Sequence, residues 1–260
     1  MSLRINQNTE AFNTYRNLSV TQGQMGKSLE KLSSGFRINR AADDAAGLAI
    51  SEGLRAQTGG LKMAGRNAQD GVSVVQTAEG ALTEVHSMLQ RMNELSVQYK
   101  NGTQNADSQA ALGSEFTALK DEIGSIQDKA SFNGVSLFPA VAATKTFQVG
   151  SESTDTIDVS LAKIDVSAAV ITDSDTVKAA VTSVSTARAD LGALQNRFEH
   201  RINSINVAVE NLSASESRIR DTDMALEMMN FTRSQILSQA GTAMLSQANQ
   251  APQGVLSLLR

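Results

Sequence analysis

The chain has 260 residues with no Cys and no Trp, and aromatic residues make up only 4% of it. A composition so poor in aromatics does not favour the thick core of a large globular domain, but it suits long helices packed at close distance. The formal net charge of −4 gives no sign of a nucleic-acid-binding surface, and no apolar run reaches the length of a membrane span. We therefore expect no nucleic acid, membrane or cofactor among its partners.

The N-terminal segment carries apolar residues at seven-residue steps. They are Ala11, Leu18, Met25 and Leu32. This spacing predicts a helix with one thin apolar stripe. The first ten residues, MSLRINQNTE, lack the apolar stretch of a secretory signal, so we expect export, if it occurs, to use another route. The absence of Cys is compatible with an exported protein that needs no disulfides.

Two adjacent aspartates follow this segment, in SSGFRINRAADDAAGLAISEGL, residues 33–54. Paired carboxylates near arginines can form an active site. A carboxylate just before a helix can equally accept hydrogen bonds from free backbone N–H groups. Because a long helical pattern begins directly after Asp44, we favour a helix cap. We also expect Arg37 and Arg40 to pair with the carboxylates of Asp43 and Asp44.

The strongest pattern in the chain is a heptad repeat that follows Asp44. One apolar row contains Leu54, Leu61, Ala68, Val75, Leu82 and Leu89, and a second contains Ala64, Ala78, Val85, Met92 and Tyr99, broken at Gly71. The two rows predict one helix of about 55 residues, roughly 80 Å long, that ends near residues 101–102. A helix of that length must pack along other long helices, as in a coiled coil.

Two later segments supply helical partners, and a short β-element lies between them. The first has apolar residues alternately four and three apart, at Leu112, Phe116, Leu119, Ile123 and Ile126. The second steps by seven through Val177, Val184, Leu191, Phe198, Ile205, Leu212 and Ile219, which favours left-handed supercoiling. Between them, FNGVSLF predicts a turn with short strands, and TFQV with TIDVSL predicts a hairpin. We place this small β-element at about residues 132–165.

The C-terminal segment carries another thin stripe of mostly small apolar residues. It contains Ala225, Met229, Ile236, Ala240, Met244 and Ala248. Taken alone, each terminal segment buries too little apolar area to offset the entropy lost on ordering. We therefore expect both ends to be mobile in the monomer and ordered only against partners, which indicates self-assembly.

Several short motifs have structural rather than chemical explanations. GQMGKS, residues 23–28, ends like a phosphate-binding loop, but Thr21 stands where that motif needs Gly. His86 and His200 each lie in a helical pattern without a second metal ligand at suitable spacing. Asp221 and Asp223 lack the Gly and closing Glu of a calcium loop, so a helix cap is the better interpretation. No HExxH, GxSxG or Cys nucleophile is present, and we expect no enzyme activity.

Longer stretches resemble bacterial flagellin. They are LSSGFRINRAADDAAGLAIS, LQRMNELSVQ, FNG and ILSQAGTAMLSQANQAPQGVLSLLR, and the resemblance covers roughly residues 1–138 and 185–260. It implies a mainly α fold: a long antiparallel helical bundle or coiled coil built from both ends of the chain. Residues 1–42 with 218–260 would form an inner terminal domain, and 43–217 a helical rod domain with the small β-element. Only about 45 residues separate the two halves, so the chain resembles a short flagellin without variable outer domains.

The resemblance implies a structural subunit of the bacterial flagellar filament, secreted unfolded and polymerised into a helical tube for swimming. Implied partners are other flagellin subunits, the flagellar secretion apparatus, an assembly chaperone, the filament cap and hook–filament junction proteins. Residues that we assign to polymerisation are Leu18, Met25, Leu32, Arg40, Asp43, Asp44, Ile236, Met244, Gln247, Gln250, Leu256 and Leu259. Asn249, Gln253 and Leu258 would join the lateral contacts near the filament axis.

A second implied partner is the innate receptor Toll-like receptor 5. The stretch LQRMNELSVQ would place Gln90, Arg91, Leu95 and Gln98 on the contact face, with Glu115 from the next helix. At two places in this region the sequence departs from that of flagellins that the receptor recognises. Asn93 stands where many recognised members carry Arg, and EIGSIQDKASFNG lacks the Arg usual in EIDRI.

Three other functions are compatible with parts of the pattern. A hook–filament junction protein would share similar ends, but the ending SQANQAPQGVLSLLR favours flagellin. An enzymatic flagellin would carry a protease in its insert, whereas this insert is short and has no zinc motif. A secreted coiled-coil adhesin would show heptads without the family endings.

Overall fold

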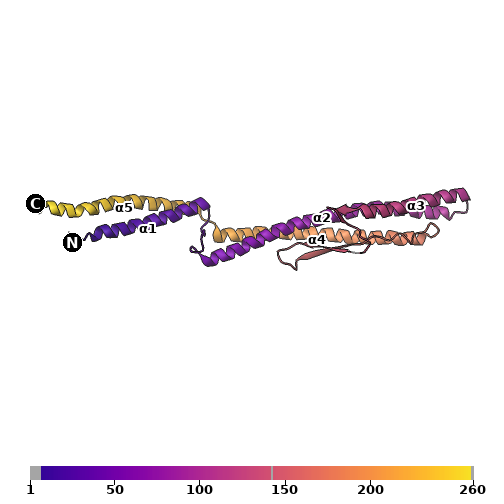
Figure 1. Ribbon diagram of the computed structural model, residues 1–260, viewed down its shortest axis with the longest axis horizontal. Helices are drawn as coiled ribbons and strands as arrows, with labels where there is room; N and C mark the ends of the chain where they lie inside the picture. The colour runs from indigo at the N-terminus through magenta and orange to yellow at the C-terminus, as the bar shows by residue number, and fades with distance from the viewer. Residues whose placement is uncertain (1–6, 142, 259–260) are drawn as a thin grey trace. The chain divides into compact units, whose positions relative to one another are not determined.

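The computed structural model of the protein describes residues 7–141 and 143–258, with side chains described as far as residue 250. In chain order the elements are α1 (Thr9–Ser34), α2 (Ala45–Tyr99), α3 (Ala106–Lys129), β1 (Ser131–Phe132), β2 (Val135–Ser136), β3 (Ala143–Gln148), β4 (Thr156–Leu161), α4 (Ser174–Arg220) and α5 (Met224–Leu258) (Figure 1). They form two compact units, residues 1–56 with 212–260 and residues 57–211. The mainly α fold with a small β-element in its middle is confirmed.

The long heptad pattern forms a single helix, as predicted. α2 is 55 residues long and ends at Tyr99, close to the expected end. From Ala68 onward its two apolar rows are buried in one core with residues of α3, α4 and the β-strands. The fully buried heptad positions from α2 are Ala68, Val75, Ala78, Leu82, Val85, Leu89 and Met92. The core is therefore a lengthwise seam between helices.

Gly71 is not a break in this seam but a recess that holds an aromatic ring. A Cβ atom added at Gly71 would lie 2.7 Å from both Cε1 and Cζ of Phe198 on α4. Phe198 is fully buried, and its ring meets that of Phe147 on β3 edge to face, with centroids 5.6 Å apart. The break in the apolar row at Gly71 thus has a structural reason, because a missing side chain on one helix makes room for a large one on the next.

Both β-turn predictions are confirmed. β1 pairs with β2 across Asn133 and Gly134, whose φ angles of 49° and 77° are the left-handed pair required by a tight two-residue hairpin. β3 pairs antiparallel with β4, and Phe147 lies opposite Ile157. Along β4, Ile157, Val159 and Leu161 are buried and alternate with exposed residues. The hairpin thus covers the helical core with one apolar face.

The chain returns from β4 to α4 through residues 162–173. Polar side chains of α2 and α3 hold this segment against the helices. The buried amide of Gln127 accepts a hydrogen bond from the Ile164 N–H at 2.7 Å and donates to the Ile164 carbonyl at 3.4 Å. Lys120 donates to the carbonyls of Ser167 and Ala169. Ser96 donates to the carbonyl of Ile171 at 2.8 Å. These bonds satisfy backbone groups that have no strand partner.

Candidate assembly interface

α1 and α5 pack side by side and antiparallel (Figure 1). At one end of the pair, the Asn8 amide donates to the Ala248 carbonyl at 2.7 Å. Leu18 packs over Gly241, where an added Cβ would lie 3.2 Å from its Cδ1. The helices approach closely at this point because Gly241 has no side chain.

Most of the side chains buried between these two helices are polar. Among the described side chains of α1 and α5, Leu18 is the only buried hydrophobic one. The other buried residues are Ser28 on α1 and Glu227 and Ser234 on α5. Burying one leucine contributes about 1.5–3 kcal/mol, whereas ordering a backbone costs about 1–2 kcal/mol per residue. The contact of α1 with α5 therefore does not explain by itself why these two segments become ordered.

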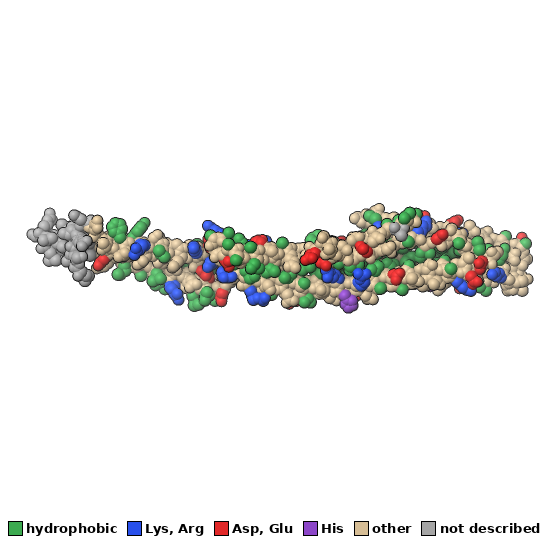
Figure 2. Space-filling view, turned by 90° about the horizontal axis from the view of Figure 1, so that it is seen from below, with side chains coloured by type: hydrophobic (Ala, Val, Ile, Leu, Met, Phe, Trp, Pro, Cys, Tyr) green, Lys and Arg blue, Asp and Glu red, His purple; other side chains and the backbone are tan. Residues whose placement is uncertain are grey.

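Large hydrophobic side chains of the same two helices point outward. Figure 2 shows hydrophobic groups at the surface along this part of the molecule. Those on α1 are Phe12, Tyr15, Val20 and Leu29, and those on α5 are Met224, Leu226, Met228, Met229, Ile236, Leu237 and Met244. Part of the α5 set lines a hollow of about 570 Å³. Exposed apolar groups gathered in this way mark a surface that binds another protein. We call these residues the outer apolar face.

The residues assigned to polymerisation from the sequence divide between the seam and the outside. Leu18 is buried in the seam, and Met25 and Leu32 are half-buried on the same side of α1. Ile236, Met244, Gln247 and Gln250 are exposed on α5. Leu256 belongs to the part of α5 whose side chains are not described, and Leu259 lies outside the described residues, as do the side chains of Gln253 and Leu258.

Sequence reasoning missed much of the outer apolar face. Phe12, Tyr15, Leu226, Met228 and Leu237 lie outside the single stripe that was assigned to each terminal helix. The available signal was the presence of large apolar residues on more than one side of each helix, which is typical of a helix covered by several neighbours.

The aspartate pair forms the start of α2, as predicted. The Asp44 carboxylate accepts from the Gly47 N–H at 2.9 Å, and the Asp44 carbonyl accepts from the Leu48 N–H at 3.0 Å. A Cβ on Gly47 would lie 2.5 Å from Oδ2 of Asp44 and 2.8 Å from Cδ1 of Ile38, so a larger residue there would displace the capping carboxylate. Asp44 is therefore a helix cap and not part of a catalytic pair.

The expected pairing of the arginines with these carboxylates is wrong. The Arg40 side chain forms an ion pair with Glu30 on α1 at 2.8 Å, and Arg37 donates to the Ile219 carbonyl at 2.5 Å. Only backbone groups bind Asp43: its Oδ2 accepts from the N–H of Arg40 at 3.0 Å and of Asn39 at 3.2 Å. The tight turn at residues 39–43 supplies N–H donors to Asp43, which leaves the long arginine side chains free to reach other segments.

The geometry of this turn predicts a pH effect. Hydrogen bonds from the backbone N–H groups of Arg40 and Asn39 hold the pKa of Asp43 below its ordinary value of 3.8. A lowered pKa in the folded state means that the carboxylate stabilises the turn above pH 3.8, and that this contribution disappears as the pH falls through the folded-state pKa. A carbon-detected NMR titration should give an Asp43 midpoint below 3.8, and a midpoint at or above that value would contradict the geometry.

A joint connects the linker after α1 to the end of α4. The N–H of Arg37 donates to the Arg220 carbonyl at 2.7 Å, and the N–H of Thr222 donates to the Gly35 carbonyl at 3.0 Å. The Arg220 guanidinium lies 4.9 Å from the centre of the Phe36 ring and pairs with Glu52 at 2.5 Å. Asp223 then caps α5 by accepting from the N–H groups of two residues in its first turn, so the predicted cap is confirmed. Sequence reasoning did not single out Arg220, because its partners come from distant segments.

Of the five residues assigned to receptor contact, four are exposed on α2 and α3: Gln90, Arg91, Gln98 and Glu115. Arg91 pairs with Glu115 at 2.9 Å and with Glu94 at 3.2 Å, and these carboxylates, Glu115 first, raise the pKa of the guanidinium. The Gln90 amide lies 3.0 Å from Nε2 of His86, and Gln98 is exposed.

Leu95 does not lie on that face. Its side chain is 0% exposed and belongs to the core beneath the face. The assignment of Leu95 as a surface contact is therefore corrected: in this structure it supports the neighbouring residues from inside, because it occupies an inward position of the helical repeat.

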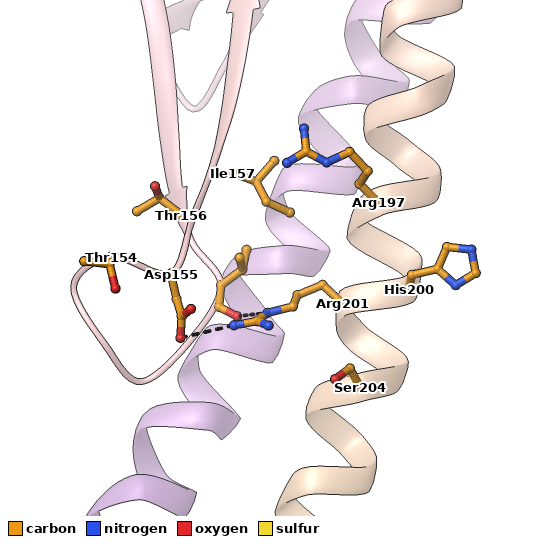
Figure 3. A pocket seen from close by; sticks show the side chains of 9 residues that line it. Thr154, Asp155, Thr156, Ile157, Arg197, His200, Arg201 and Ser204 are labelled. Atoms are coloured by element: carbon orange, nitrogen blue, oxygen red, sulfur yellow. Dashed lines mark hydrogen bonds and ion pairs between the residues drawn. The ribbon is translucent and has the colours of Figure 1, made fainter.

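No arrangement of catalytic or metal-binding groups is found in the part of the chain that the structure describes. No cluster of His, Asp or Glu could hold a metal ion there. An open pocket of about 470 Å³ lies between the β3–β4 turn and α4 (Figure 3). Within it, Arg201 binds Asp155 at 3.1 Å and the Val149 carbonyl at 2.8 Å, while His200 points away from the turn. These contacts fasten the hairpin to α4 and do not form a reactive group. Among the described helices, none is both long and apolar enough to cross a membrane.

Terminal helices that expose large apolar side chains, in a mainly α protein, are typical of self-assembling structural subunits. The family model described as the bacterial flagellin N-terminal helical region matches residues 5–146. The model described as the bacterial flagellin C-terminal helical region matches residues 174–259. The chain belongs to the bacterial flagellin family, and is a short member without outer domains.

Relatives match the chain over nearly its full length. A flagellin of Halalkalibacterium halodurans is 53% identical over 270 residues, covering 98% of this chain and 99% of the relative. A flagellin of Bacillus subtilis is 45% identical over 304 residues, covering 99% and 100% respectively. The flagellar filament 33 kDa core protein of Treponema phagedenis is 43% identical over 284 residues, covering 98% and 99%. The protein is accordingly a structural subunit of the extracellular flagellar filament and not an enzyme.

Proposed function

We propose that the outer apolar face of α1 and α5 is the surface on which subunits stack, and that residues 1–42 and 218–260 become ordered as the filament forms. The observation that supports this is the arrangement of the terminal pair: among the described side chains, most of those that are buried are polar, while many large apolar ones are exposed. A head-to-tail contact that does not close on itself generates an open helical filament. Neighbouring copies would supply the apolar burial that the pair lacks.

Delayed ordering of the ends would also serve export. Helices such as α1 and α5, whose described side chains include one buried hydrophobic residue, are easily kept extended and would pass through the flagellar secretion apparatus unfolded. An assembly chaperone would cover the outer apolar face inside the cell, and the filament cap would guide its ordering outside. Hook–filament junction proteins would present a matching surface to the first subunits of the filament.

Hydrogen exchange tests this proposal directly. In dilute monomer, the backbone amides of α1 and α5 should exchange rapidly, while those of α2 from Ala68 to Met92 should be protected by the core. After elongation from filament seeds, the amides of α1 and α5 should become protected as well. Slow exchange throughout both terminal helices of the monomer would contradict the proposal, and failure to elongate from seeds would contradict assembly itself.

We also propose that Toll-like receptor 5 recognises the exposed face formed by Gln90, Arg91, Gln98 and Glu115. These four polar side chains come from two adjacent helices, and the ion pair of Arg91 with Glu115 fixes the two charged groups relative to each other. A fixed arginine and carboxylate offer bidentate hydrogen bonding to a partner.

Replacing Arg91 with alanine should weaken receptor activation by soluble monomer by about tenfold or more, the scale of removing one interface arginine. Folding should hardly change, since exposed ion pairs contribute about 0–1 kcal/mol. Arg55→Ala is the matched control, because Arg55 lies on the same helix and faces a glutamate, Glu52, three residues away. Dose–response curves in receptor-expressing cells measure the effect. Equal potency of the Arg91 and Arg55 variants would remove the support for this face.

A further inference from the structure

The methionines of the protein are concentrated on one exposed helix. The chain has nine methionines, and four of them, Met224, Met228, Met229 and Met244, lie on α5. These four are between 48% and 62% exposed. In contrast, Met92 on α2 is 0% exposed, inside the helical core. The thioether sulfurs of α5 are therefore open to small reagents in solution, whereas that of Met92 is shielded.

Met228 and Met229 form part of the apolar hollow on α5. The hollow is also lined by Ala225, Ile236 and Leu237. Methionine is suited to such a surface because its unbranched, polarisable side chain adapts to the shape of whatever covers it. In the described part of the chain, no hydrogen bond engages the sulfur of either residue. Since Met228 and Met229 are 53% and 61% exposed, both side chains stay in contact with solvent until another molecule packs on them.

Exposed thioethers react with hydrogen peroxide without a metal or an enzyme. The sulfur attacks one peroxide oxygen, the O–O bond breaks, and an S=O bond forms while the other oxygen leaves as water. Sulfur is oxidised by two electrons and the peroxide is reduced. The product, methionine sulfoxide, is polar and chiral, and reductases can convert it back to methionine.

We propose that Met224, Met228, Met229 and Met244 are an oxidation site that switches assembly: peroxide blocks the free subunit, whereas assembled subunits are protected. This inference rests on the proposed function, in which other copies of the chain cover α5. When a neighbouring copy covers α5, a sulfoxide on α5 must lose its hydration water or hold that copy away, as any buried polar group without a partner does. We expect the critical concentration for elongation to rise by about tenfold or more when Met228 and Met229 are oxidised.

The first measurement establishes where peroxide reacts. Full-length soluble protein is treated with hydrogen peroxide, quenched, and examined by peptide mass spectrometry for the addition of one oxygen atom. The four α5 methionines should react at least about tenfold faster than Met92, whose sulfur is buried in the core. When preformed filaments receive the same treatment, the α5 methionines should react much more slowly than in the monomer. Equal rates at Met92 and on α5, or unchanged rates in filaments, would overturn the proposal.

The second measurement establishes the effect on assembly. Oxidised and untreated proteins are added to filament seeds, and elongation is followed by light scattering and electron microscopy. Oxidised protein should elongate poorly, and treatment with methionine sulfoxide reductases should restore it. Confirmed sulfoxides at Met228 and Met229 with normal elongation would overturn the proposal.

Two variants assign the effect to these residues. Replacing the four α5 methionines with leucine keeps similar volume and apolar character, so this variant should elongate normally and resist peroxide. The matched control is Met63→Leu, since Met63 on α2 is also about half exposed; this variant should remain as sensitive as the parent. If the four-leucine variant stays sensitive, damage elsewhere is responsible and the proposal fails. If untreated parent protein does not elongate at all, the proposed function itself fails, which is a distinguishable result.

Discussion

Replacing Phe198 with alanine should lower the free energy of unfolding by about 3–5 kcal/mol, the usual cost of removing a buried phenylalanine side chain. Phe198 is fully buried, fills the recess at Gly71, and stacks edge to face on Phe147 of the hairpin. Its removal empties a position where α2, α4 and β3 meet. Because the neighbouring helices are held by many other contacts, they cannot collapse into the space, and the cavity remains.

A second substitution tests the contact between Phe198 and α2 from the side of α2. Gly71→Ala should destabilise by about 1–3 kcal/mol, because the new Cβ would lie 2.7 Å from the Phe198 ring. Gly80→Ala is the matched control on the same helix, where an added Cβ meets no atom within 4 Å. Alanine favours a helix more than glycine does, so this control should stabilise by up to about 1 kcal/mol.

Denaturant unfolding followed by circular dichroism gives all three values on the full chain. The decisive comparison is between the two glycine variants, since they differ only in what the added methyl group touches. If both substitutions stabilise the protein, the ring of Phe198 does not occupy the recess and the account of the core is wrong.

Replacing Ile236 with aspartate should abolish elongation while leaving the monomer folded. Ile236 is exposed on α5 and contributes to the outer apolar face, so the new carboxylate stays hydrated in the free subunit. When a neighbouring copy covers this surface, an unpaired charge must leave water, which costs several kcal/mol and should raise the critical concentration by more than about a hundredfold.

Gln235→Asp provides the control for charge. It places the same carboxylate one residue earlier, about 100° around the helix, at another exposed position. Seeded elongation and sedimentation of the remaining monomer measure both variants, and circular dichroism checks that they are folded. Normal filaments from the Ile236 variant would show that this face is not covered in the filament, and equal inhibition by both would show that net charge is responsible.

Local sequence patterns predicted those features that depend on neighbouring residues along the chain. The heptad rows gave the length and end of α2 because a helix buries whichever residues recur on one side. Contacts within three residues also determine the helix caps at Asp44 and Asp223 and the turn at Asn133 and Gly134, so the sequence predicted these features as well. Family resemblance then supplied the function, which no spacing of residues encodes.

Tertiary structure decided which residues face which partner. Family resemblance assigned Leu95 to a contact surface, although Leu95 belongs to the core. Periodicity showed that the apolar row is broken at Gly71 but not that Phe198 occupies the space left there. Long arginine side chains can reach several carboxylates, and only the path of the linker selects Glu30 for Arg40 and Glu52 for Arg220. Likewise, only the packing of α1 against α5 shows that Glu227 and Ser234 lie inside while large apolar side chains such as Ile236 remain exposed, because the segments packed against a helix decide which of its faces is covered.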